Sequence, residues 1–310
     1  MNTTADTSHP VPGLRLSRRA EAAIVVALFV LALALRMVAP GVSPPGFNDD
    51  ELSNTFVISQ HVREGDIRLY YPDASGHEGL YHIVAAPLLP LFGPTHLGIR
   101  GLSILCGALG VVLLYLLARR LWGTPVALIA ALGLALSFWS LIYSRTGQRH
   151  ISLTVFALLA FACWWEGLGA ENVPRGARLR AGQFAWYAAS GAALGLGFYT
   201  YFAARGVPLI LIAFAGYLLL FHRARFMQHW QGFALALVIA AALGAPLALT
   251  LSANPEAEAR IDELAAPLYA LRDGDPSMLV EYALRTLGMF AFTGDDEALY
   301  NIPYRPVFGV

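Results

Sequence analysis

The stretch A-E-A-A-I-V-V-A-L-F-V-L-A-L-A-L-R-M-V, residues 20–38, decides the fold class. It is an almost unbroken apolar run of about 20 residues, the length that an α-helix needs to cross a bilayer core. It is long and lacks a small-residue cleavage site, so we expect a retained anchor rather than a signal peptide. Similar runs follow along the chain. The sequence therefore predicts an all-α polytopic membrane protein.

The composition supports this class and excludes several others. The chain of 310 residues is 57% hydrophobic and 14% charged, whereas soluble domains have roughly 45–50% apolar and 25% charged residues. The 21 basic residues are all arginine and balance 21 acidic residues, so no nucleic-acid footprint is present. The lack of lysine excludes Schiff-base chemistry. Cys106 and Cys163 lie inside apolar runs, which argues against a disulfide framework or a thiolate metal site.

Hydropathy and charge together predict about seven spans. The segment from Leu80 to Phe92 is short for a span and contains two prolines, so we expect it to lie at the interface. The short loops then place their arginines in the cytoplasm with the N-terminus, as the positive-inside rule requires. The expected spans are residues 20–38, 98–118, 124–143, 150–168, 184–203, 206–221 and 231–251. The loop arginines are Arg119, Arg120, Arg175, Arg178, Arg180, Arg223 and Arg225.

This topology divides the chain into three parts. Residues 1–19 form a cytoplasmic N-terminus, residues 20–251 a transmembrane domain with interfacial helices in an external loop at 39–97, and residues 252–310 an extracytoplasmic segment. Most acidic residues then lie outside, between Asp49 and Glu78 or between Glu256 and Glu297. The tail has a helical pattern around residues 277–292 and is either a lid over an outer site or a connector.

The acidic run G-F-N-D-D-E, residues 46–51, follows the first span closely. Ionisable groups at a membrane boundary are costly to desolvate and usually mark function. Asp49, Asp50 and Glu51 are therefore candidate catalytic residues. The alternative is an acidic first turn of the next helix, which the helix dipole favours.

Arginines and tyrosines gather at the same predicted outer face. Arg145 and Arg149 belong to Y-S-R-T-G-Q-R at 143–149, and Tyr199, Tyr201 and Arg205 to Y-T-Y-F-A-A-R at 199–205. Arginine suits phosphate because its planar guanidinium donates two parallel hydrogen bonds. The alternatives are arginines that snorkel to the interface and an ordinary aromatic belt.

His77 and Glu78 precede the short apolar segment. Glu78 is a candidate second carboxylate. With Asp49 it would orient an acceptor or hold a divalent cation, because carboxylate oxygens suit hard cations, and His77 is a candidate for the same role. The alternative is capping of the helix that follows. No residue pattern makes a metal necessary.

An ordered set of motifs resembles bacterial glycosyltransferases of the GT-C superfamily. It comprises P-P-G-F-N-D-D-E (44–51), G-H-E-G-L-Y-H-I-V (76–84), L-F-G (91–93), L-L-A-R-R-L-W-G (116–123), Y-S-R-T-G-Q-R (143–149), Y-T-Y-F-A-A-R (199–205) and N-I-P-Y-R-P (301–306). The similar proteins are the family 39 enzymes, related to protein O-mannosyltransferases and the lipid A aminoarabinose transferase. The set covers most of residues 40–310.

The resemblance implies an integral enzyme of the cytoplasmic membrane that transfers sugar from a polyprenyl-phosphate donor on the extracytoplasmic face. The family's catalytic aspartate matches Asp50, with Glu51 after it. Asn48-Asp49 precede the pair here, so Asp49 is the alternative base. The family continues beyond the last motif, which leads us to expect that the chain is a fragment. We expect an inverting enzyme in a lipid environment.

Two functions of other classes compete with this reading. A lipid-linked glycan flippase would need polar groups along its spans or helices broken at the midplane, and the span interiors are nearly free of charge. A purely structural assembly subunit would leave the outer arginines and aspartates without a role.

Overall fold

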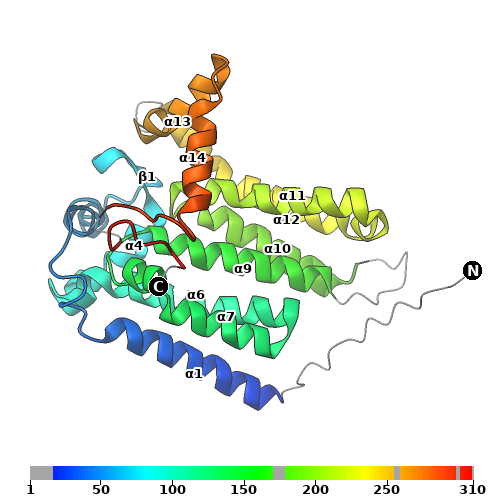
Figure 1. Cartoon of the computed structure of the whole chain (residues 1–310), viewed down its shortest axis with the longest axis horizontal. Helices are drawn as coiled ribbons and strands as arrows, with labels where there is room; N and C mark the ends of the chain where they lie inside the picture. Colours follow the sequence, from blue (N-terminus) through cyan, green and yellow to red (C-terminus); the bar gives the residue numbers. More distant parts are fainter. Residues whose placement is uncertain (1–16, 170–178, 255–258, 298–300, 309–310) are drawn as a thin grey trace, which may run out of the picture.

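In a computed structural model of the chain, the described residues are 17–169, 179–254, 259–297 and 301–308. Figure 1 shows a bundle of long helices that run side by side, with short elements gathered at one end. The bundle contains α1 (Arg18–Met37), α6 (His96–Trp122), α7 (Thr124–Leu136), α8 (Phe138–Ser144), α9 (His150–Leu168), α10 (Ala181–Gly197), α11 (Val207–Phe221) and α12 (Arg223–Ala253).

The predicted all-α membrane architecture is confirmed, with a smaller number of long spans. Five helices in the described residues are long and apolar enough to cross a membrane, or six if α7 and α8, bent by 57°, form one span. The chain bends at Ser137, whose ψ of 130° is not helical. The expected span at 184–203 corresponds to α10, a helix of 17 residues that ends earlier, at Gly197, and carries Gln183, Ser190 and several glycines. The 3-10 helix η3 (Phe202–Gly206) then leads into α11.

Small residues allow the helices to approach closely. At Gly191 of α10, an added Cβ would lie 2.3 Å from the carbonyl oxygen of Ala236 in α12. Trp164 of α9 stacks on Phe233 of α12 with ring centroids 4.5 Å apart. A second buried cluster, rich in alanine, joins α1, α6 and α7. These two clusters form the core that holds the site at one end of the bundle.

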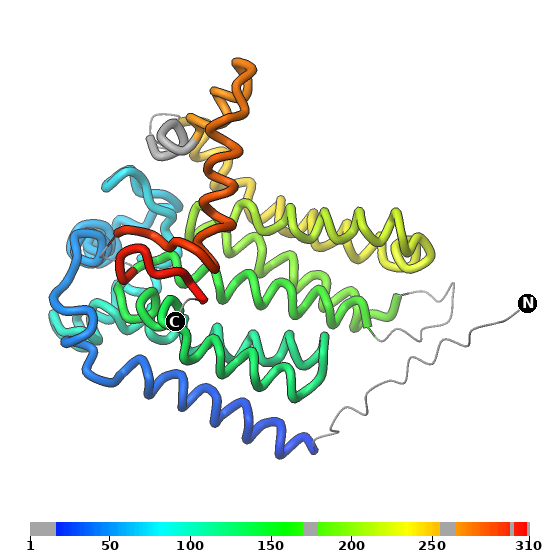
Figure 2. Tube along the Cα trace, in the orientation of Figure 1, coloured from blue at the N-terminus to red at the C-terminus, as the bar shows by residue number. Residues whose placement is uncertain are grey.

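The segment between α1 and α6 stays at one end of the bundle (Figure 2). It contains α2 (Asp49–Leu52), the π-helix η1 (Ser53–Ile58), α3 (Ser59–Arg63), the 3-10 helix η2 (Asp73–Ser75), α4 (Gly79–Ala85) and α5 (Leu88–Phe92). Strands β1 (Tyr70–Tyr71) and β2 (His77–Glu78) pair antiparallel. Helices α4 and α5 have only seven and five residues, so the segment 79–92 does not run the length of the bundle.

The last part of the chain returns to the bundle after leaving it. Helices α13 (Ala259–Arg272) and α14 (Ser277–Gly288) project from the end that carries the short elements (Figure 1). Val307 and Phe308 then donate backbone hydrogen bonds to Met289 and Phe290 at 3.0 and 2.9 Å. They also line a cavity of about 400 Å³ together with Tyr143 and His150. The helix predicted at 277–292 is confirmed as α14.

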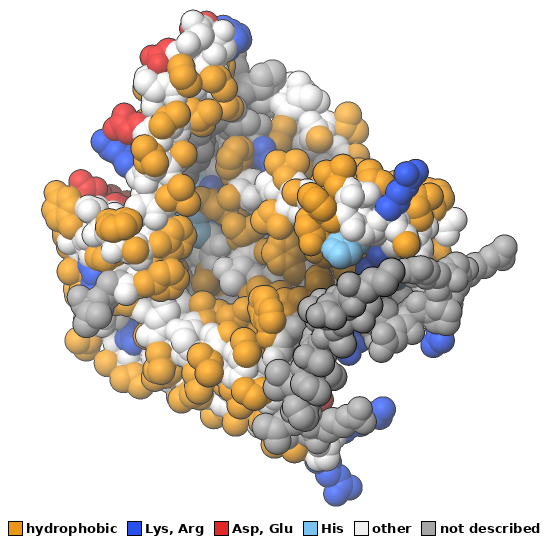
Figure 3. All heavy atoms as spheres, turned by 45° about the vertical axis from the view of Figure 1, so that its right-hand side comes forward, with side chains coloured by type: hydrophobic (Ala, Val, Ile, Leu, Met, Phe, Trp, Pro, Cys, Tyr) orange, Lys and Arg blue, Asp and Glu red, His pale blue; other side chains and the backbone are white. Residues whose placement is uncertain are grey.

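Charge is unevenly distributed over the bundle. Hydrophobic side chains cover much of its visible side (Figure 3). Arg119 contacts Glu21, and Arg225 donates to the carbonyl oxygen of Gly169 at 3.2 Å, so these arginines share the end away from α2. Arg175, Arg178 and most of the N-terminal segment 1–19 lie outside the described residues. The side of the membrane on which each end lies stays a prediction.

Candidate functional site

The acidic run folds into a capped helix start. The backbone amide of Glu51 donates to Asn48 Oδ1 at 2.8 Å, and the Asn48 amide donates to Glu51 Oε2 at 3.0 Å. This reciprocal pair is a capping box, which satisfies two backbone donors at a helix N-terminus. Asn48 is therefore the cap of α2, and Asp49, Asp50 and Glu51 form the acidic first turn that the alternative predicted.

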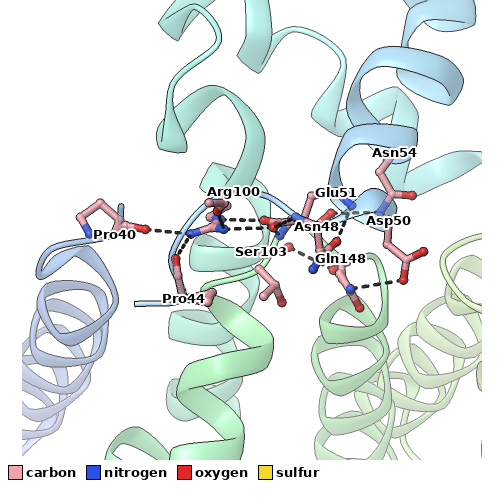
Figure 4. A network of polar contacts seen from close by, with 12 residues as sticks. Pro40, Pro44, Asn48, Asp50, Glu51, Asn54, Arg100, Ser103 and Gln148 are labelled. Carbon is pink, nitrogen blue, oxygen red and sulfur yellow. Dashed lines mark hydrogen bonds and ion pairs between the residues drawn. The ribbon is translucent and has the colours of Figure 1, made fainter. Parts of the chain in front are cut away.

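Glu51 forms the centre of a buried ion pair with Arg100 of α6 (Figure 4). Arg100 Nε and Nη2 lie 2.6 and 3.0 Å from the two carboxylate oxygens, and both side chains are 1% exposed. The amide of Gly147 also donates to Glu51 at 2.7 Å. Arg100 donates further to the carbonyls of Pro40 and Pro44 at 2.8 and 3.2 Å. Glu51 thus ties the acidic loop to α6 and to the segment before α9.

Asp50 occupies a different environment one residue earlier. Its side chain is exposed, and Gln148 Nε2 lies 3.4 Å from Asp50 Oδ2. Gln148 is itself fully buried, and its carbonyl accepts a hydrogen bond of 3.0 Å from Ser103 of α6. Asp49 is also exposed on the same turn. Asp50 is therefore an accessible carboxylate whose neighbour, Gln148, is fixed by the core.

A second cluster joins the other predicted residues around Glu78. Arg205 Nη2 lies 3.2 Å from Glu78 Oε1, and Arg149 Nη1 lies 3.9 Å from Glu78 Oε2. Arg149 also donates to the carbonyl of Gly76 at 3.1 Å, and its guanidinium lies 5.7 Å from the ring of Tyr201. Glu78 and Arg149 are buried, while Arg205 is 28% exposed. Glu78 is therefore hydrogen-bonded to Arg205 and forms a longer ion pair with Arg149.

The two clusters are continuous through the chain. Gln148, which contacts Asp50, is the residue before Arg149. Tyr199 links the start of α4, next to Glu78, to α12. Its carbonyl accepts a hydrogen bond of 2.8 Å from the Leu80 amide, and its hydroxyl donates to the carbonyl of Leu243 at 2.6 Å. The structure thus brings Asp50, Arg149, Arg205 and both tyrosines of the motif to one end of the bundle.

Arg145 is turned away from this group. It donates to the carbonyls of Leu35 and Ala39 at 3.3 and 3.0 Å and to that of Val38. Burial, and secondarily the nearby Arg100, lower the pKa of Arg145. Arg145 therefore contacts the C-terminal end of α1. Although it stands only four residues before Arg149, the two arginines have different partners.

His77, which was predicted to hold a cation with Glu78, has protein contacts of its own. His77 Nδ1 lies 3.1 Å from the carbonyl of Asp73, and its ring packs edge-on against His82 with centroids 5.3 Å apart. Burial lowers the pKa of His82 to about 4. Among the described residues, no group of three or more His, Cys, Asp or Glu side chains is arranged to hold a metal ion.

Three residues that organise this end were not predicted from the sequence. Arg100 holds Glu51, Gln148 contacts Asp50, and the fully buried Arg36 donates to Ser140 and Ser144, both at 2.8 Å. The sequence does contain a signal for Arg36 and Arg100, because each stands within an apolar run, where a charged side chain needs partners. Gln148 belongs to the motif at 143–149, but an uncharged amide between candidate phosphate-binding arginines gives no separate functional signal.

Comparison with known proteins agrees with this architecture. Two crystal structures of ArnT from Cupriavidus metallidurans, one bound to undecaprenyl phosphate and one in the apo state, align with TM-scores of 0.54 and 0.55 at 18% and 20% identity. They cover 78% of this chain and 42% and 44% of the ArnT chains. At this identity the likeness shows the fold alone.

Relatives found by sequence align with a shorter part of the chain than these structures do. An undecaprenyl phosphate-alpha-4-amino-4-deoxy-L-arabinose arabinosyl transferase from Pseudomonas aeruginosa (strain LESB58) is 36% identical over 112 residues, 36% of this chain and 19% of its own. An uncharacterized protein from Aquifex aeolicus (strain VF5) is 36% identical over 106 residues, 34% of this chain and 20% of its own. The chain thus aligns with about a fifth of the length of these relatives.

The family match covers more of the chain. Residues 80–249, which run from α4 to α12 and include Arg149, Tyr199, Tyr201 and Arg205, match the family described as dolichyl-phosphate-mannose-protein mannosyltransferase. The chain therefore belongs to the dolichyl-phosphate-mannose-protein mannosyltransferase family, and its resemblance to the family 39 glycosyltransferases of the GT-C superfamily is confirmed.

Proposed function

We propose that the chain acts as a membrane glycosyltransferase that moves a hexosyl or pentosyl group from a polyprenyl-phosphate donor to a hydroxyl of a lipid, glycan or protein. The observation that carries this proposal is the exposed carboxylate of Asp50 beside Gln148 and the Arg149–Glu78–Arg205 cluster. The relatives' names support the donor class, since they specify sugars carried on undecaprenyl phosphate or dolichyl phosphate.

In this proposal Asp50 is the general base of an inverting displacement. The acceptor hydroxyl attacks the anomeric carbon while the bond from that carbon to the phosphate oxygen breaks. Asp50 takes the hydroxyl proton, and the polyprenyl phosphate leaves with the bonding electron pair. Geometry matters more than solution acidity for such a base, and Asp50 is the acid of the run that is both exposed and hydrogen-bonded to a buried side chain. Asp49 is the alternative base.

Arg149 and Arg205 would hold the donor phosphate and stabilise the charge that develops on it. Charge-assisted hydrogen bonds from guanidinium to phosphate are short and strong, and fixed donors act best where they need no reorganisation. Glu78 is hydrogen-bonded to Arg205 and forms an ion pair with Arg149, so we assign it a positioning role. Tyr201 would close one side of this site, because its ring lies against Arg149.

The proposed location is the cytoplasmic membrane with the site on the extracytoplasmic side. Glu51 of the acidic run contacts Arg100 near the start of α6, whereas Arg119 and Arg120 lie near the end of that helix and Arg223 and Arg225 lie at the start of α12, at the other end of the bundle. The positive-inside rule supports the orientation that keeps those arginines in the cytoplasm.

The test replaces Asp50 with asparagine. Asp50→Asn keeps the shape and most hydrogen bonds but cannot accept a proton, so sugar transfer from a panel of polyprenyl-phosphate hexoses and pentoses should fall about 10²–10⁴-fold. Donor binding, measured by calorimetry with the same panel, should be unchanged. Asp49→Asn is the matched control and should retain most of the activity. Full transfer by Asp50→Asn would refute the catalytic assignment, and a loss confined to Asp49→Asn would move the base by one residue.

A further inference from the structure

The end of the bundle away from Asp50 contains a cavity of about 580 Å³ between α1, α6, α9 and α10. Arg100 and Arg119 mark the two ends of α6, and 19 residues of helix separate them by roughly 30 Å. The walls of the cavity are mainly apolar and include Leu113, Leu116, Leu117, Leu159, Ala162 and Trp186. This cavity therefore plays no part in the site described above.

The cavity is open toward the outer surface of the bundle. Leu116, Leu159 and Trp186 line it and are 38%, 37% and 45% exposed. They stand on α6, α9 and α10, of which α6 and α9 are long and apolar enough to span a membrane. An exposed apolar surface on such helices faces lipid chains. The cavity, called the recess below, is therefore bordered by apolar side chains that are accessible from outside the bundle.

Two ion pairs stand at the polar rim of the recess. Arg119 pairs with Glu21, and Arg120 Nε lies 3.1 Å from Glu166 Oε1. All four residues line the cavity. The second pair is the more accessible, with side chains 46% and 35% exposed. Among the described residues that line the cavity, the rim therefore offers two guanidinium groups and two carboxylates, whose charges balance.

We propose that this recess binds a zwitterionic phospholipid whose head group carries a phosphate and a primary ammonium. The phosphate would bind Arg120 and the ammonium would bind Glu166, so the head group replaces one protein ion pair with two charge-assisted contacts. An anionic lipid would bind the arginine but leave the carboxylate beside its own negative charge. A quaternary ammonium has no N–H to donate to the carboxylate. The acyl chains would lie against the leucines of α6 and α9.

The test is competitive lipid binding by the intact chain. The protein is released from detergent micelles that contain equal amounts of dioleoyl phosphatidylethanolamine, phosphatidylcholine and phosphatidylglycerol, and retained lipid is identified by native mass spectrometry. Phosphatidylethanolamine should be retained at least about fivefold over each of the others. Equal retention of phosphatidylcholine, or preferential retention of phosphatidylglycerol, would overturn the proposal without any variant.

Variants locate the binding. Arg120→Gln/Glu166→Gln should abolish the preference for phosphatidylethanolamine, and Ala162→Phe, which fills the recess and leaves the charges, should reduce retention of all three lipids. The matched control is Glu281→Gln/Arg285→Gln, which removes an exposed ion pair of 2.6 Å on α14 and should behave as wild type. An unchanged preference in Arg120→Gln/Glu166→Gln would show that the rim does not select the head group. Sugar transfer does not enter this readout, so the result is independent of the proposed function.

Discussion

Asp50 and Glu51 are neighbours in sequence with different surroundings. Successive residues of a helix point about 100° apart, so the start of α2 turns Glu51 into the protein and Asp50 outward. Glu51 accepts hydrogen bonds from Arg100, Gly147 and Asn48, which occupies its carboxylate. We therefore assign Glu51 to positioning of the acidic loop and leave proton transfer to Asp50.

Removal of the Glu51 charge should destabilise the protein. Glu51→Gln leaves the guanidinium of Arg100 buried without its counter-charge, and loss of one partner of a buried pair costs about 3–5 kcal/mol. Thermal unfolding in detergent should show a clearly lower midpoint. Asp49→Asn, on the exposed side of the same turn, should stay within about 0.5 kcal/mol of wild type. A wild-type midpoint for Glu51→Gln would mean that the ion pair does not hold the loop.

Arg149 and Arg145 provide a matched pair for phosphate binding. Arg149→Ala should weaken binding of a polyprenyl-phosphate sugar at least tenfold, because a buried hydrogen bond to a charged group contributes roughly 1.5–3 kcal/mol. Arg145→Ala should leave donor affinity nearly unchanged, because its guanidinium donates to carbonyls in the last turn of α1 and just after it. Isothermal titration with a short-chain polyprenyl-phosphate sugar measures both. Equal losses in the two variants would contradict the separation of these arginines.

At the scale of elements, the π-helix η1 lies directly after the acidic turn. Its wider turn presents Asn54 inward, where Nδ2 donates to the carbonyl of Gly147 at 3.0 Å. Single-turn π-helices are frequent at functional sites. Gly147 is thus held from both sides, by Asn54 through its carbonyl and by Glu51 through its amide. This arrangement fixes the backbone that leads into Gln148 and Arg149.

The contact between α10 and α12 gives a test of packing at the same scale. Gly191→Ala places a methyl group 2.3 Å from a backbone carbonyl oxygen of α12, so the helices must separate, which costs typically about 1–3 kcal/mol. Gly216→Ala on α11 is the control, since nothing lies within 4 Å of an added Cβ there. That change should be neutral or stabilise by up to about 1 kcal/mol. Chemical denaturation of both variants gives the comparison; equal stability would rule out the tight helix contact.

At the scale of the whole molecule, the two ends of the bundle carry different chemistry. One end carries the acidic run with Arg100 (Figure 4) and the Glu78 cluster, and the other carries Arg119 near the end of α6 and Arg225 near the start of α12. The helices that join the two ends are covered largely by apolar side chains. This distribution of charge favours a single orientation of the bundle in a membrane, with each end on one defined side.

Accessibility labelling tests the proposed orientation. A cysteine introduced at Glu64, which is exposed near the acidic run, should react with an impermeant thiol reagent in intact cells. A cysteine at Arg223, exposed at the other end, should react only after lysis. Background should be low because Cys106 and Cys163 are buried. The opposite labelling pattern would reverse the topology.

The amino-acid sequence by itself determined the membrane fold class, most helix positions and the motif residues of the candidate site. These follow from local properties, because the length of an apolar run and the position of charges at its ends can be read along the chain. Only the tertiary structure decided which of those residues share partners. It separated Glu51 from Asp50 and Arg145 from Arg149, and it brought Glu78 to Arg205 across 127 positions of sequence. The physical reason is that the burial and pairing of a charge depend on how helices distant in sequence pack together. A local sequence pattern does not contain this information.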